Sequence, residues 1–569
     1  MIEYRDSLIK YLQEEKEFCE AEIATHKLLS REEKAIEGLM ICDTIAEPQE
    51  NSNECIFRFA ENNTKARLGD MVKIRSTRTN VAVDALMMIL EVTTDYVVIE
   101  TGSHEFPDGS TWDIEISEVS MFDTFVSVLE SIDESAPGAY FLQQLAGKEQ
   151  PTDESMFGAD PKAIEKANTY AEILNENQMD ALYYAVKQPS LRLIQGPPGT
   201  GKTHVLACIA NIMSTIGMEV AIVAKTHQAV NNALNAIKKC NSNLNVIKIG
   251  QSIRSEGLEE SVLSFEKYYD YLTWRKREKN RGTADVVGMT LQASAVNMCL
   301  RNSGFKPQVV LVDEASQIPL AEAAIVGASG AGTVIFIGDD RQMPPIFVEP
   351  LEHDRFSVSI FQHIADMYPD IKDILNITYR MNEEICSFDS KNFYEPYGIK
   401  LVSSDSAKDR ELVVDASSCG DERITEILGS EDSIHYINVS QENHEEENVE
   451  EALFAAQCAS VALQNGISAN DIAIVTPFRK QVNAIRNAFK YLRWPEEERP
   501  LVDTVERLQG QDVEMIILSF AVSDNAYFNK IKDFLLNRNR LNVMISRAKT
   551  KVVILGSDKV QNELKTILK

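Results

Sequence analysis

A glycine-rich turn in the first half of the chain has the residue types and spacing of a phosphate-binding loop. It follows an apolar run at 191–194, which predicts a buried strand, and precedes a predicted helix from Val205 to Met213. Glycines let such a loop curl, so that successive backbone N–H groups point at phosphate oxygens beside the positive end of the helix. The G-x-x-x-x-G-K-T turn consists of Gly196, Pro197, Pro198, Gly199, Thr200, Gly201, Lys202 and Thr203.

Two adjacent carboxylates follow a second apolar run, at 309–312. We expect Lys202 to reach the β- and γ-phosphates of a nucleotide, and Thr203 and Asp313 to hold Mg²⁺. Glu314 is placed to orient and deprotonate the attacking water. An acidic cap on the next helix would explain these carboxylates alone, but not their pairing with a phosphate loop. The sequence therefore predicts binding and hydrolysis of a nucleoside triphosphate.

The elements that must position these residues repeat along the chain. Beyond a polar linker at 147–163, apolar strands alternate with helices twice over, which predicts two α/β domains with parallel sheets. Before the linker, helical spacing gives way to period-two alternation, which predicts a stalk helix and then a small β-barrel. The expected parts are a stalk helix at 1–39, a barrel at 40–125, a connecting segment at 126–164, a first α/β domain at 165–348 with a charged, helical insert at 251–282, and a second α/β domain at 349–569 with a polar insert at 398–435.

Charge and cysteine usage limit the function classes. The net charge is −30, and residues 1–160, with 13 Lys and Arg against 33 Asp and Glu, carry −20 of it. Such acidity weakens indiscriminate binding to polyanions but leaves room for a local basic groove in the rest of the chain. The nine cysteines form no C-x-x-C pair, which argues against a zinc module. Free thiols and the absence of an apolar run of eighteen residues predict a cytoplasmic protein.

Six further segments narrow the class of nucleotide enzyme. Their order and spacing resemble superfamily 1 helicases of the up-frameshift branch, and the resemblance covers about residues 165–569. It implies two tandem RecA-like domains, ATP and Mg²⁺ as cofactors, single-stranded DNA or RNA as partner, and 5′-to-3′ movement. The segments are 175–178 (NENQ), 226–232 (THQAVNN), 338–345 (GDDRQMPP), 379–381 (YRM), 504–511 (TVERLQGQ) and 541–549 (LNVMISRAK).

The resemblance also implies roles for single residues of the nucleotide site. Gln178 would bind the adenine edge and Tyr379 would stack on the base. Gln342 would sense the γ-phosphate, while Arg380 and Arg547 of the second domain would act as arginine fingers. The sequence departs from the family pattern in small ways that keep every charge, at Asp512 (a cofactor-binding candidate), Glu514 and Lys549.

A translocating enzyme must hold a nucleic-acid backbone without reading its sequence, and small polar side chains at loop ends can do so. The resemblance implies such contacts in both domains. In the barrel, Lys73 and Arg75 share one strand face, which we expect to line the nucleic-acid channel, although a solubilising surface is the alternative. The candidates in the α/β domains are Thr226, His227, Asn231, Thr290, Thr476, Pro477 and Thr504.

Three functions remain open on the sequence. The first is a helicase that translocates and unwinds, with DNA slightly favoured because no motif announces contacts to the 2′-OH of RNA. The second is an ATP-gated clamp or remodeller that displaces proteins from a strand without separating duplexes. The third is a scaffold with decayed catalytic parts, which the intact charged residues of the nucleotide site disfavour. Protein partners are open, and the acidic N-terminal portion is a candidate docking surface.

Overall fold

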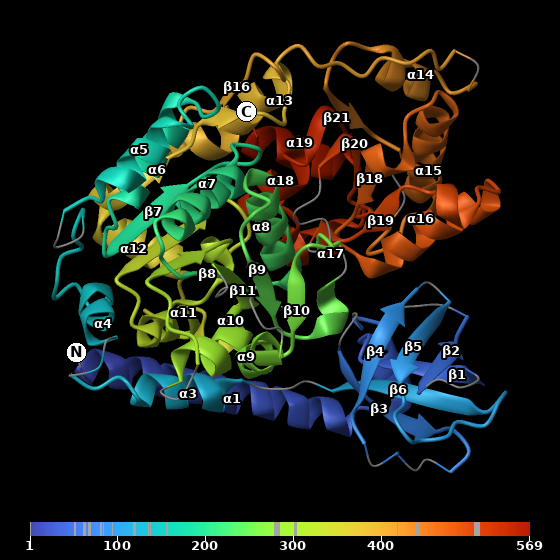
Figure 1. The fold of residues 1–569 in the computed structure, drawn as a ribbon. Coiled ribbons are helices and arrows are strands. Elements are labelled where there is room, and N and C mark those ends of the chain that lie inside the picture. The colour runs from blue at the N-terminus through green and yellow to red at the C-terminus, as the bar shows by residue number, and fades with distance from the viewer. Residues whose placement is uncertain are drawn as a thin grey trace.

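The computed structural model describes residues 2–49, 53–60, 64–66, 70–79, 82–83, 85–93, 95–117, 121–134, 136, 138–154, 158–255, 257–277, 285–300, 304–417, 419–439, 443–505 and 512–568. Figure 1 shows two α/β lobes side by side, a barrel below the second lobe, and a long N-terminal helix that runs along the base of the first lobe to the barrel. In the described part of the chain, no helix is both long and apolar enough to cross a membrane.

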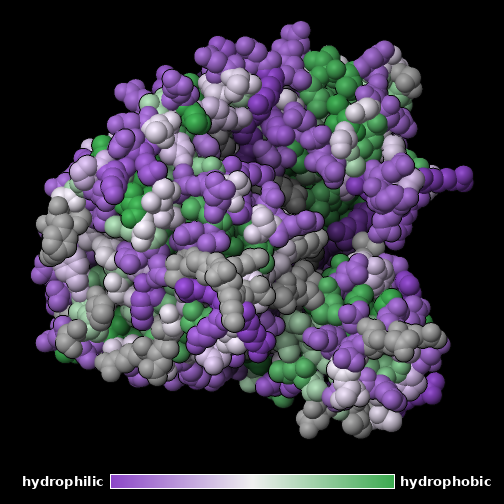
Figure 2. Space-filling model, in the orientation of Figure 1, coloured by the Kyte–Doolittle hydropathy of each residue, from purple (hydrophilic) through white to green (hydrophobic). Residues whose placement is uncertain are grey.

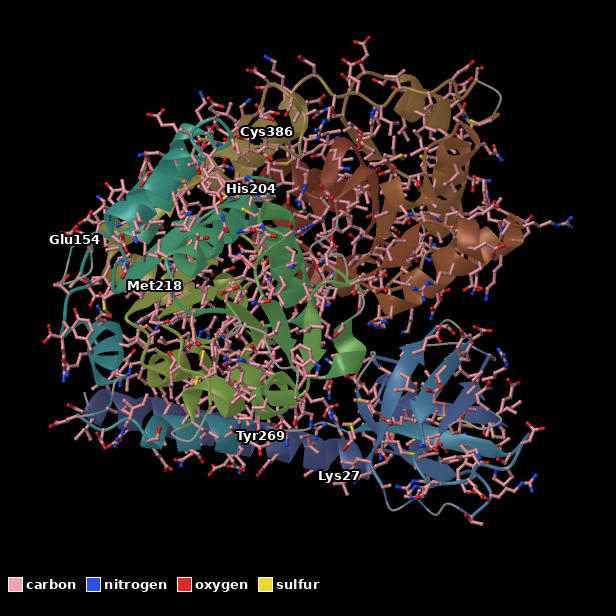
Figure 3. All side chains as sticks on the ribbon, viewed as in Figure 1. Lys27, Glu154, His204, Met218, Tyr269 and Cys386 are labelled. Carbon is pink, nitrogen blue, oxygen red and sulfur yellow. The ribbon has the colours of Figure 1, made fainter. Side chains whose placement is uncertain are left out.

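The stalk consists of two helices, α1 (Ile2–Leu28) and α2 (Arg31–Ile36). The sequence predicted one helix to residue 39, but Ser30 caps a new helix, because its hydroxyl accepts from Glu33 N while the Glu33 carboxylate accepts from Ser30 N. Leu8, Tyr11 and Leu12 of α1 are buried in the core of the first lobe. Lys27 marks the far end of α1, beside the barrel (Figure 3). The stalk is thus fixed at one end to the first lobe.

The barrel that the sequence predicted is present as a closed antiparallel sheet. Its strands alternate between buried and exposed residues, as a two-residue period requires, and Phe57, Val72 and Ile114 lie in its core. The strand order is β1-β2-β5-β4-β3-β6. The bounds are β1 Met40–Pro48, β2 Glu54–Arg58, β3 Met71–Ser76, β4 Met87–Val92, β5 Tyr96–Glu100 and β6 Thr111–Ser117.

The first lobe is a parallel sheet with the order β10-β9-β11-β8-β12-β13-β7-β14 and apolar cores on both faces. Its strands are β7 Leu191–Gln195, β8 Val220–Ala224, β9 Val246–Ile249, β10 Leu263–Phe265, β11 Val286–Thr290, β12 Val309–Val312, β13 Thr333–Gly338 and β14 Lys372–Ile374. Its helices are α3 Phe122–Glu130, α4 Ala139–Leu145, α5 Pro161–Asn168, α6 Glu176–Val186, α7 Lys202–Thr215, α8 His227–Cys240, α9 Tyr268–Arg277, α10 Leu291–Ser294, α11 Leu320–Ala323 and α12 Ile360–Met367.

The second lobe repeats the plan with a parallel sheet in the order β17-β21-β20-β18-β19 and a two-stranded parallel pair, β15-β16. Its strands are β15 Ile377–Thr378, β16 Val402–Ser403, β17 Ile434–Ile437, β18 Ile472–Val475, β19 Leu501–Asp503, β20 Val513–Ser519 and β21 Ala548–Leu555. Its helices are α13 Glu383–Asp389, α14 Glu422–Gly429, α15 Val449–Gln464, α16 Arg479–Tyr491, α17 Asn525–Leu535, α18 Arg538–Ile545 and α19 Asp558–Ile567.

One expected boundary and the expected structure of one insert need correction, and the second insert gains described elements. Residues 349–375, expected in the second domain, belong to the first lobe, because α12 packs in its core and β14 pairs with β7. The insert at 251–282, expected to be helical, contributes the edge strand β10 as well as α9 where the structure describes it. The insert at 398–435 holds β16 and α14 in its described residues.

Candidate nucleotide site and strand-binding edge

The phosphate loop lies between β7 and α7, as the sequence predicts. Gly199 (φ 73°) and Gly201 (φ 83°) adopt the left-handed backbone that glycine favours. A Cβ on Gly199 would lie 2.5 Å from Arg380 Cβ, so the second lobe packs directly on the loop. Lys202 Nζ donates to the Gly196 carbonyl at 2.6 Å, and the Thr200 hydroxyl donates to the Pro197 carbonyl at 2.7 Å. The backbone of the loop is therefore fixed by its own side chains and by the opposite lobe.

The predicted base-binding residues meet at the start of α6. The Gln178 amide nitrogen donates to the Thr200 carbonyl at 2.9 Å, and its amide oxygen accepts from Asn175 N at 3.1 Å. The Asn175 side chain in turn donates to the Tyr379 hydroxyl at 2.9 Å, and Tyr379 N donates to the Gly199 carbonyl at 2.8 Å. Tyr379 keeps 39% of its surface exposed. The structure thus places a half-exposed ring of the second lobe beside the phosphate loop.

The two carboxylates lie at the end of β12, on the same edge of the sheet as the loop. Asp313 is buried, and burial together with the neighbouring charge of Glu314 raises its pKa to about 7, while Lys202 opposes the rise. Glu314 has a φ of 52°, an uncommon backbone for a non-glycine residue. Its side chain accepts from Gln317 Nε2 at 3.2 Å. This bend turns two consecutive carboxylates toward one site.

The donors present fit a nucleotide-bound Mg²⁺. In the described residues, no group of three or more His, Cys, Asp or Glu side chains could hold a metal by itself. Mg²⁺ in nucleotide enzymes is usually held by one or two protein oxygens together with substrate phosphates. Asp313, a buried carboxylate whose charge lacks full compensation, and the Thr203 hydroxyl are donors of this type.

Polar side chains of both lobes join at the seam, which we define as the contact between residues 338–342 of the first lobe and α18 with its following residues in the second. Arg547 Nη2 donates to the Gln342 side chain at 3.2 Å, and Gln342 Nε2 donates to Asp339 at 2.8 Å. The Tyr394 hydroxyl donates to Asp339 at 2.6 Å and accepts from Asn542 at 2.9 Å. The predicted sensor and one predicted finger are therefore in direct contact.

Arg380 completes the arrangement from the loop after β15. Its Nη1 donates to the Ser546 carbonyl at 3.0 Å, and its Nε lies 3.5 Å from Asp512, which makes Asp512 a partner of the finger. Burial lowers the pKa of both arginines, that of Arg547 to about 10, where the nearby Arg380 charge lowers it further. Two buried cations so close together repel each other, and a triphosphate would add anions to the charge that Asp512 supplies.

Several residues in or beside the seam and the loop that carries Arg380 escaped the sequence analysis. Neither carboxylate oxygen of Asp389, a fully buried residue of α13, has a hydrogen-bond partner among the described residues, and burial raises its pKa well above the usual range. Asn539 donates to the Gln342 carbonyl at 2.6 Å. Arg410, in the polar insert, donates to the carbonyls of Tyr379 and Arg380 at 3.2 and 3.1 Å. In the sequence, Asn539 and Asp389 could have been noticed only because they lie near segments 541–549 and 379–381.

The predicted strand contacts lie where parallel strands end. Thr226 follows β8, Thr290 ends β11, and both hydroxyls accept a helix-capping N–H. Thr476 follows β18, with Pro477 beside it, and Thr504 follows β19. Such carboxyl ends are where open α/β sheets bind ligands. In the first lobe, the nucleotide site and the strand candidates thus share one edge of the sheet. The nucleotide site lies at the ends of β7, β12 and β13, and the strand candidates lie at the ends of β8 and β11.

Two of these candidates have structural roles in the first lobe. The Asn231 side chain is buried and donates to the Arg254 carbonyl at 3.2 Å, so it holds the segment after β9. His227 packs against Gly250, and burial with the nearby charges of Lys248 and Arg254 lowers its pKa to about 3. His227 is therefore a neutral ring, which can hydrogen-bond but adds no charge.

Lys73 and Arg75 of the barrel lie apart from the other candidates. They pair across the strands with Glu115 and Asp113 of β6. Those carboxylates also bind α2, because Lys34 lies 2.6 Å from Glu115 and Arg31 lies 2.7 Å from Asp113. The face that carries the two cations therefore belongs to the junction of barrel and stalk, and its nucleic-acid role stays a prediction.

Comparisons with known proteins agree with this arrangement. One family model described as an AAA domain matches residues 173–349, and a second with the same description matches residues 356–559. The boundary between the two matches therefore lies before α12 and β14, which the structure places in the first lobe.

Among curated relatives, the chain is 27% identical over 406 residues to a DNA replication ATP-dependent helicase/nuclease of Schizosaccharomyces pombe, which covers 68% of this chain and 28% of the relative. It is 27% identical over 454 residues to a DNA polymerase alpha-associated DNA helicase of the same yeast, covering 70% and 65%. It is 26% identical over 518 residues to an uncharacterized ATP-dependent helicase of Methanocaldococcus jannaschii, covering 75% and 74%. The chain thus spans less than a third of the first relative's length.

Among solved structures, an arterivirus nonstructural protein 10 helicase aligns with a TM-score of 0.42 at 12% identity, covering 93% of this chain and 81% of that one. The phosphate loop, the paired carboxylates and the matched domains together place the chain in its family. These matches support its assignment to the superfamily 1 helicases of the up-frameshift-like branch, a class of ATP-dependent enzymes.

Proposed function

We propose that the chain is an ATP-driven translocase on single-stranded nucleic acid that unwinds duplexes, with DNA as the preferred strand. The observation that carries the proposal is the contact between Arg547 and Gln342, because it joins a cation of the second lobe to the first-lobe edge that holds the phosphate loop. Hydrolysis then requires both lobes, and a change of the nucleotide changes how the lobes meet.

Each side chain has a defined task in this scheme. Lys202 binds the terminal phosphates and Glu314 takes a proton from the attacking water. Arg380 and Arg547 neutralise the charge that spreads over the transferring phosphoryl group. Thr203 and Asp313 would hold Mg²⁺, which would supply charge neutralisation at the phosphate oxygens. Gln342 contacts Arg547 and so links the state of the phosphate to the position of the second lobe.

The strand lies, in this proposal, across the carboxyl ends of β8, β11, β18 and β19. Thr226 and Thr290 contact its backbone from the first lobe, and Thr476 and Thr504 from the second. When the lobes close and open, the distance between these two pairs changes, which moves the strand in steps. Support for DNA comes from relatives whose names describe DNA helicases, and movement from 5′ to 3′ is the expectation for this branch. Free thiols at all nine cysteines fit our further proposal of a cytoplasmic location.

ATPase stimulation by matched single-stranded DNA and RNA tests the proposal, with Lys202→Ala as the inactive control. We expect stimulation by both strands, larger for DNA, and none in the control. Unwinding of duplexes with a 5′ or a 3′ single-stranded tail then tests direction, and only the 5′ tail should support strand release. Stimulated turnover with no release from either duplex would favour the clamp, and no stimulation by any strand would reject both functions.

A further inference from the structure

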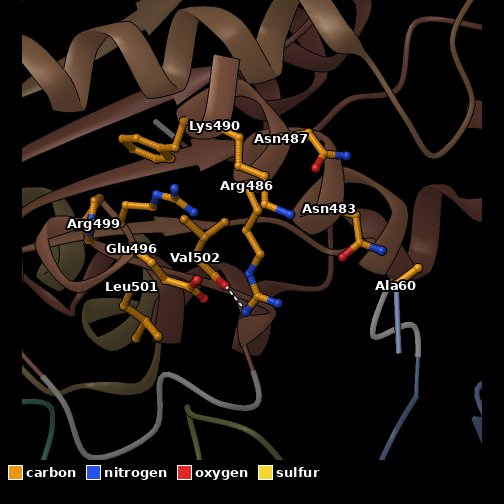
Figure 4. A pocket seen from close by; sticks show the side chains of 11 residues that line it. Ala60, Asn483, Arg486, Asn487, Lys490, Glu496, Arg499, Leu501 and Val502 are labelled. Atoms are coloured by element: carbon orange, nitrogen blue, oxygen red, sulfur yellow. Dashed lines mark hydrogen bonds between the residues drawn. The ribbon is translucent and has the colours of Figure 1, made fainter. Parts of the chain in front are cut away.

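A basic pocket lies where the second lobe faces the barrel, outside the sites described so far. Figure 4 shows it between Ala60, which follows β2 of the barrel, and the outer face of α16 beside the edge strand β19. The surface is notched between the second lobe and the barrel on this side of the molecule (Figure 2). The cavity has a volume of about 190 Å³. The polar lining residues on which the argument depends are Asn483, Arg486, Asn487, Lys490, Glu496 and Arg499.

Cations outnumber carboxylates in this pocket, in a chain whose net charge is −30. Arg486, Lys490 and Arg499 face a single lining carboxylate, Glu496. Arg486 Nη2 donates to the Val502 carbonyl at 2.9 Å, and Arg499 donates through two nitrogens to the Trp494 carbonyl. These contacts fix the two guanidinium groups in place. Asp503 lies 3.8 Å from Arg486 and forms an ion pair with it.

The pocket continues a polar stripe along α16. Positions 479, 483, 486, 487 and 490 recur at three- and four-residue spacing, so they share one face of the helix, while the opposite face is buried in the second lobe. The stripe begins directly after Thr476 and Pro477 and ends at Lys490, a distance of roughly 16 Å along the helix at 1.5 Å per residue. Amides and cations alternate on it, the side chains that bind phosphates without reading bases.

We propose that this pocket binds the phosphodiester backbone of the nucleic-acid strand, beyond the contacts at Thr476 and Thr504 and at the entrance to the gap between the second lobe and the barrel. The inference rests on the proposed function, because it extends the path of the same strand. A nucleic-acid backbone is favoured over an acidic protein segment because the stripe joins the pocket to a strand-binding loop. Arg486 and Lys490 lie about one helical turn apart, a spacing that can present charges to successive phosphates.

The decisive variant adds negative charge to the pocket without touching a structural contact. Asn487 and Lys490 are exposed and lie three residues apart on α16, so we choose Asn487→Asp with Lys490→Glu. A matched control exists at the opposite edge of the same sheet, where Asn562 and Lys565 are exposed and three residues apart on α19. Asn562→Asp with Lys565→Glu gives the same change in net charge, so any general effect of added acidity appears in both variants.

Affinity for a fluorescent oligodeoxythymidine of about 20 nucleotides is measured for the full chain and both variants between low and moderate salt. We expect the α16 variant to lose roughly ten-fold in affinity at low salt, and its salt dependence to fall by about one phosphate contact, a change of ~0.7 in the log–log slope for single strands. The α19 variant should stay within about two-fold of the parent chain. Basal ATPase activity and the midpoint of thermal unfolding should be unchanged in both.

If the two variants bind the strand with equal affinity and equal salt dependence, whether or not both are weaker than the parent chain, the inference is overturned and the proposed function stays intact. Loss of binding by the α16 variant to the same degree at every salt concentration would also contradict a phosphate contact. Failure of the parent chain itself to bind the strand would instead reject the proposed function. Inorganic phosphate, added at the same concentration as the phosphates of the oligonucleotide, should not displace the strand. Strong displacement would instead assign the pocket to a free anion.

Discussion

The seam between the two lobes and the junctions of the barrel are held together by different kinds of contact. At the seam, buried side chains cross directly, as in the hydrogen bonds from Asn542 to the Arg341 carbonyl at 2.9 Å and from Arg547 to Gln342 at 3.2 Å. At the barrel, Arg254 of the first lobe lies 3.3 Å from Asp70, and both side chains are more than a quarter exposed. Buried polar groups must stay paired, whereas exposed pairs contribute little.

This difference shows which part of the molecule must hold its geometry. The nucleotide site depends on atoms from both lobes within hydrogen-bond distance, so a small displacement there alters chemistry. The barrel contributes no residue to the nucleotide site in the described parts of the chain, and its ion pair with the first lobe is partly exposed, so we expect the barrel to tolerate displacement from that lobe better than the two lobes tolerate displacement at the seam. The following predictions test this contrast, beginning with the seam.

Removing a finger should have the largest effect. We expect Arg547→Ala to lower kcat for ATP hydrolysis by about 10³-fold or more, because the charge on the transferring phosphoryl group loses a buried cation. Nucleotide binding, measured with a fluorescent ATP analogue, should change far less, since Lys202 and the loop remain. Arg547→Lys should recover only a small part of the rate. A variant with a normal rate would show that the seam is structural and not catalytic.

Replacing Glu314, the proposed general base, tests the contribution of the first lobe to hydrolysis. Glu314→Gln keeps the side-chain volume and the bend at this position but cannot accept a proton, so kcat should fall by roughly 10²–10⁴-fold. The nucleotide should bind as tightly as before, and strand affinity should still respond to it. If Glu314→Gln also abolished nucleotide binding, the carboxylate would have a role in holding the nucleotide rather than in activating water.

The stalk gives an intermediate effect that depends on pH. Burial and the charge of Glu322 raise the pKa of Glu15, on α1, from 4.5 to about 7. The folded state therefore holds a proton that the unfolded state releases, and stability falls as pH rises from 4.5 to about 7. Glu15→Gln should increase the free energy of unfolding by roughly 1–3 kcal/mol at pH 8 and by almost nothing at pH 4.5. Denaturant titrations at the two pH values, with exposed Glu17→Gln as control, measure this difference, and an equal effect at both pH values would contradict it.

The barrel junction should give the smallest effect. Asp70→Asn removes the half-exposed pair with Arg254, so stability should change by less than about 1 kcal/mol. Protection of the barrel backbone from hydrogen exchange should decrease near β3 while the first lobe is unaffected. A loss of several kcal/mol would mean that the barrel is docked as firmly as the lobes are.

The sequence allowed prediction of those features that are formed by residues close together along the chain. The phosphate loop and Asp313–Glu314 follow buried strands directly, so a strand run and the residues after it define both halves of the site. Gly199 and Gly201 occupy the left-handed backbone that such a loop requires. The barrel was predictable for the same reason, because a two-residue alternation marks each strand.

Other features depend on distant residues and left no local signal. Tyr394 meets Asp339 across 55 positions of sequence, and nothing near either residue indicates the contact. Strand β14, Lys-Asp-Ile, is short and polar because it lies at a sheet edge, where Asp373 pairs with Arg192 at 2.7 Å, so the first domain was predicted to end too early. Lys73 and Arg75 share a face, as expected, but the acidic residues opposite them come from another strand.

A crystal structure of the full chain with ADP, aluminium fluoride, Mg²⁺ and a single strand tests the central claim most directly, because it fixes the atoms around the phosphoryl group. We predict that Lys202 of the first lobe and Arg547 of the second both lie within hydrogen-bond distance of the fluoride group. A structure in which the nucleotide contacts Lys202 while Arg380 and Arg547 both remain out of reach would contradict the claim that the lobes share one nucleotide.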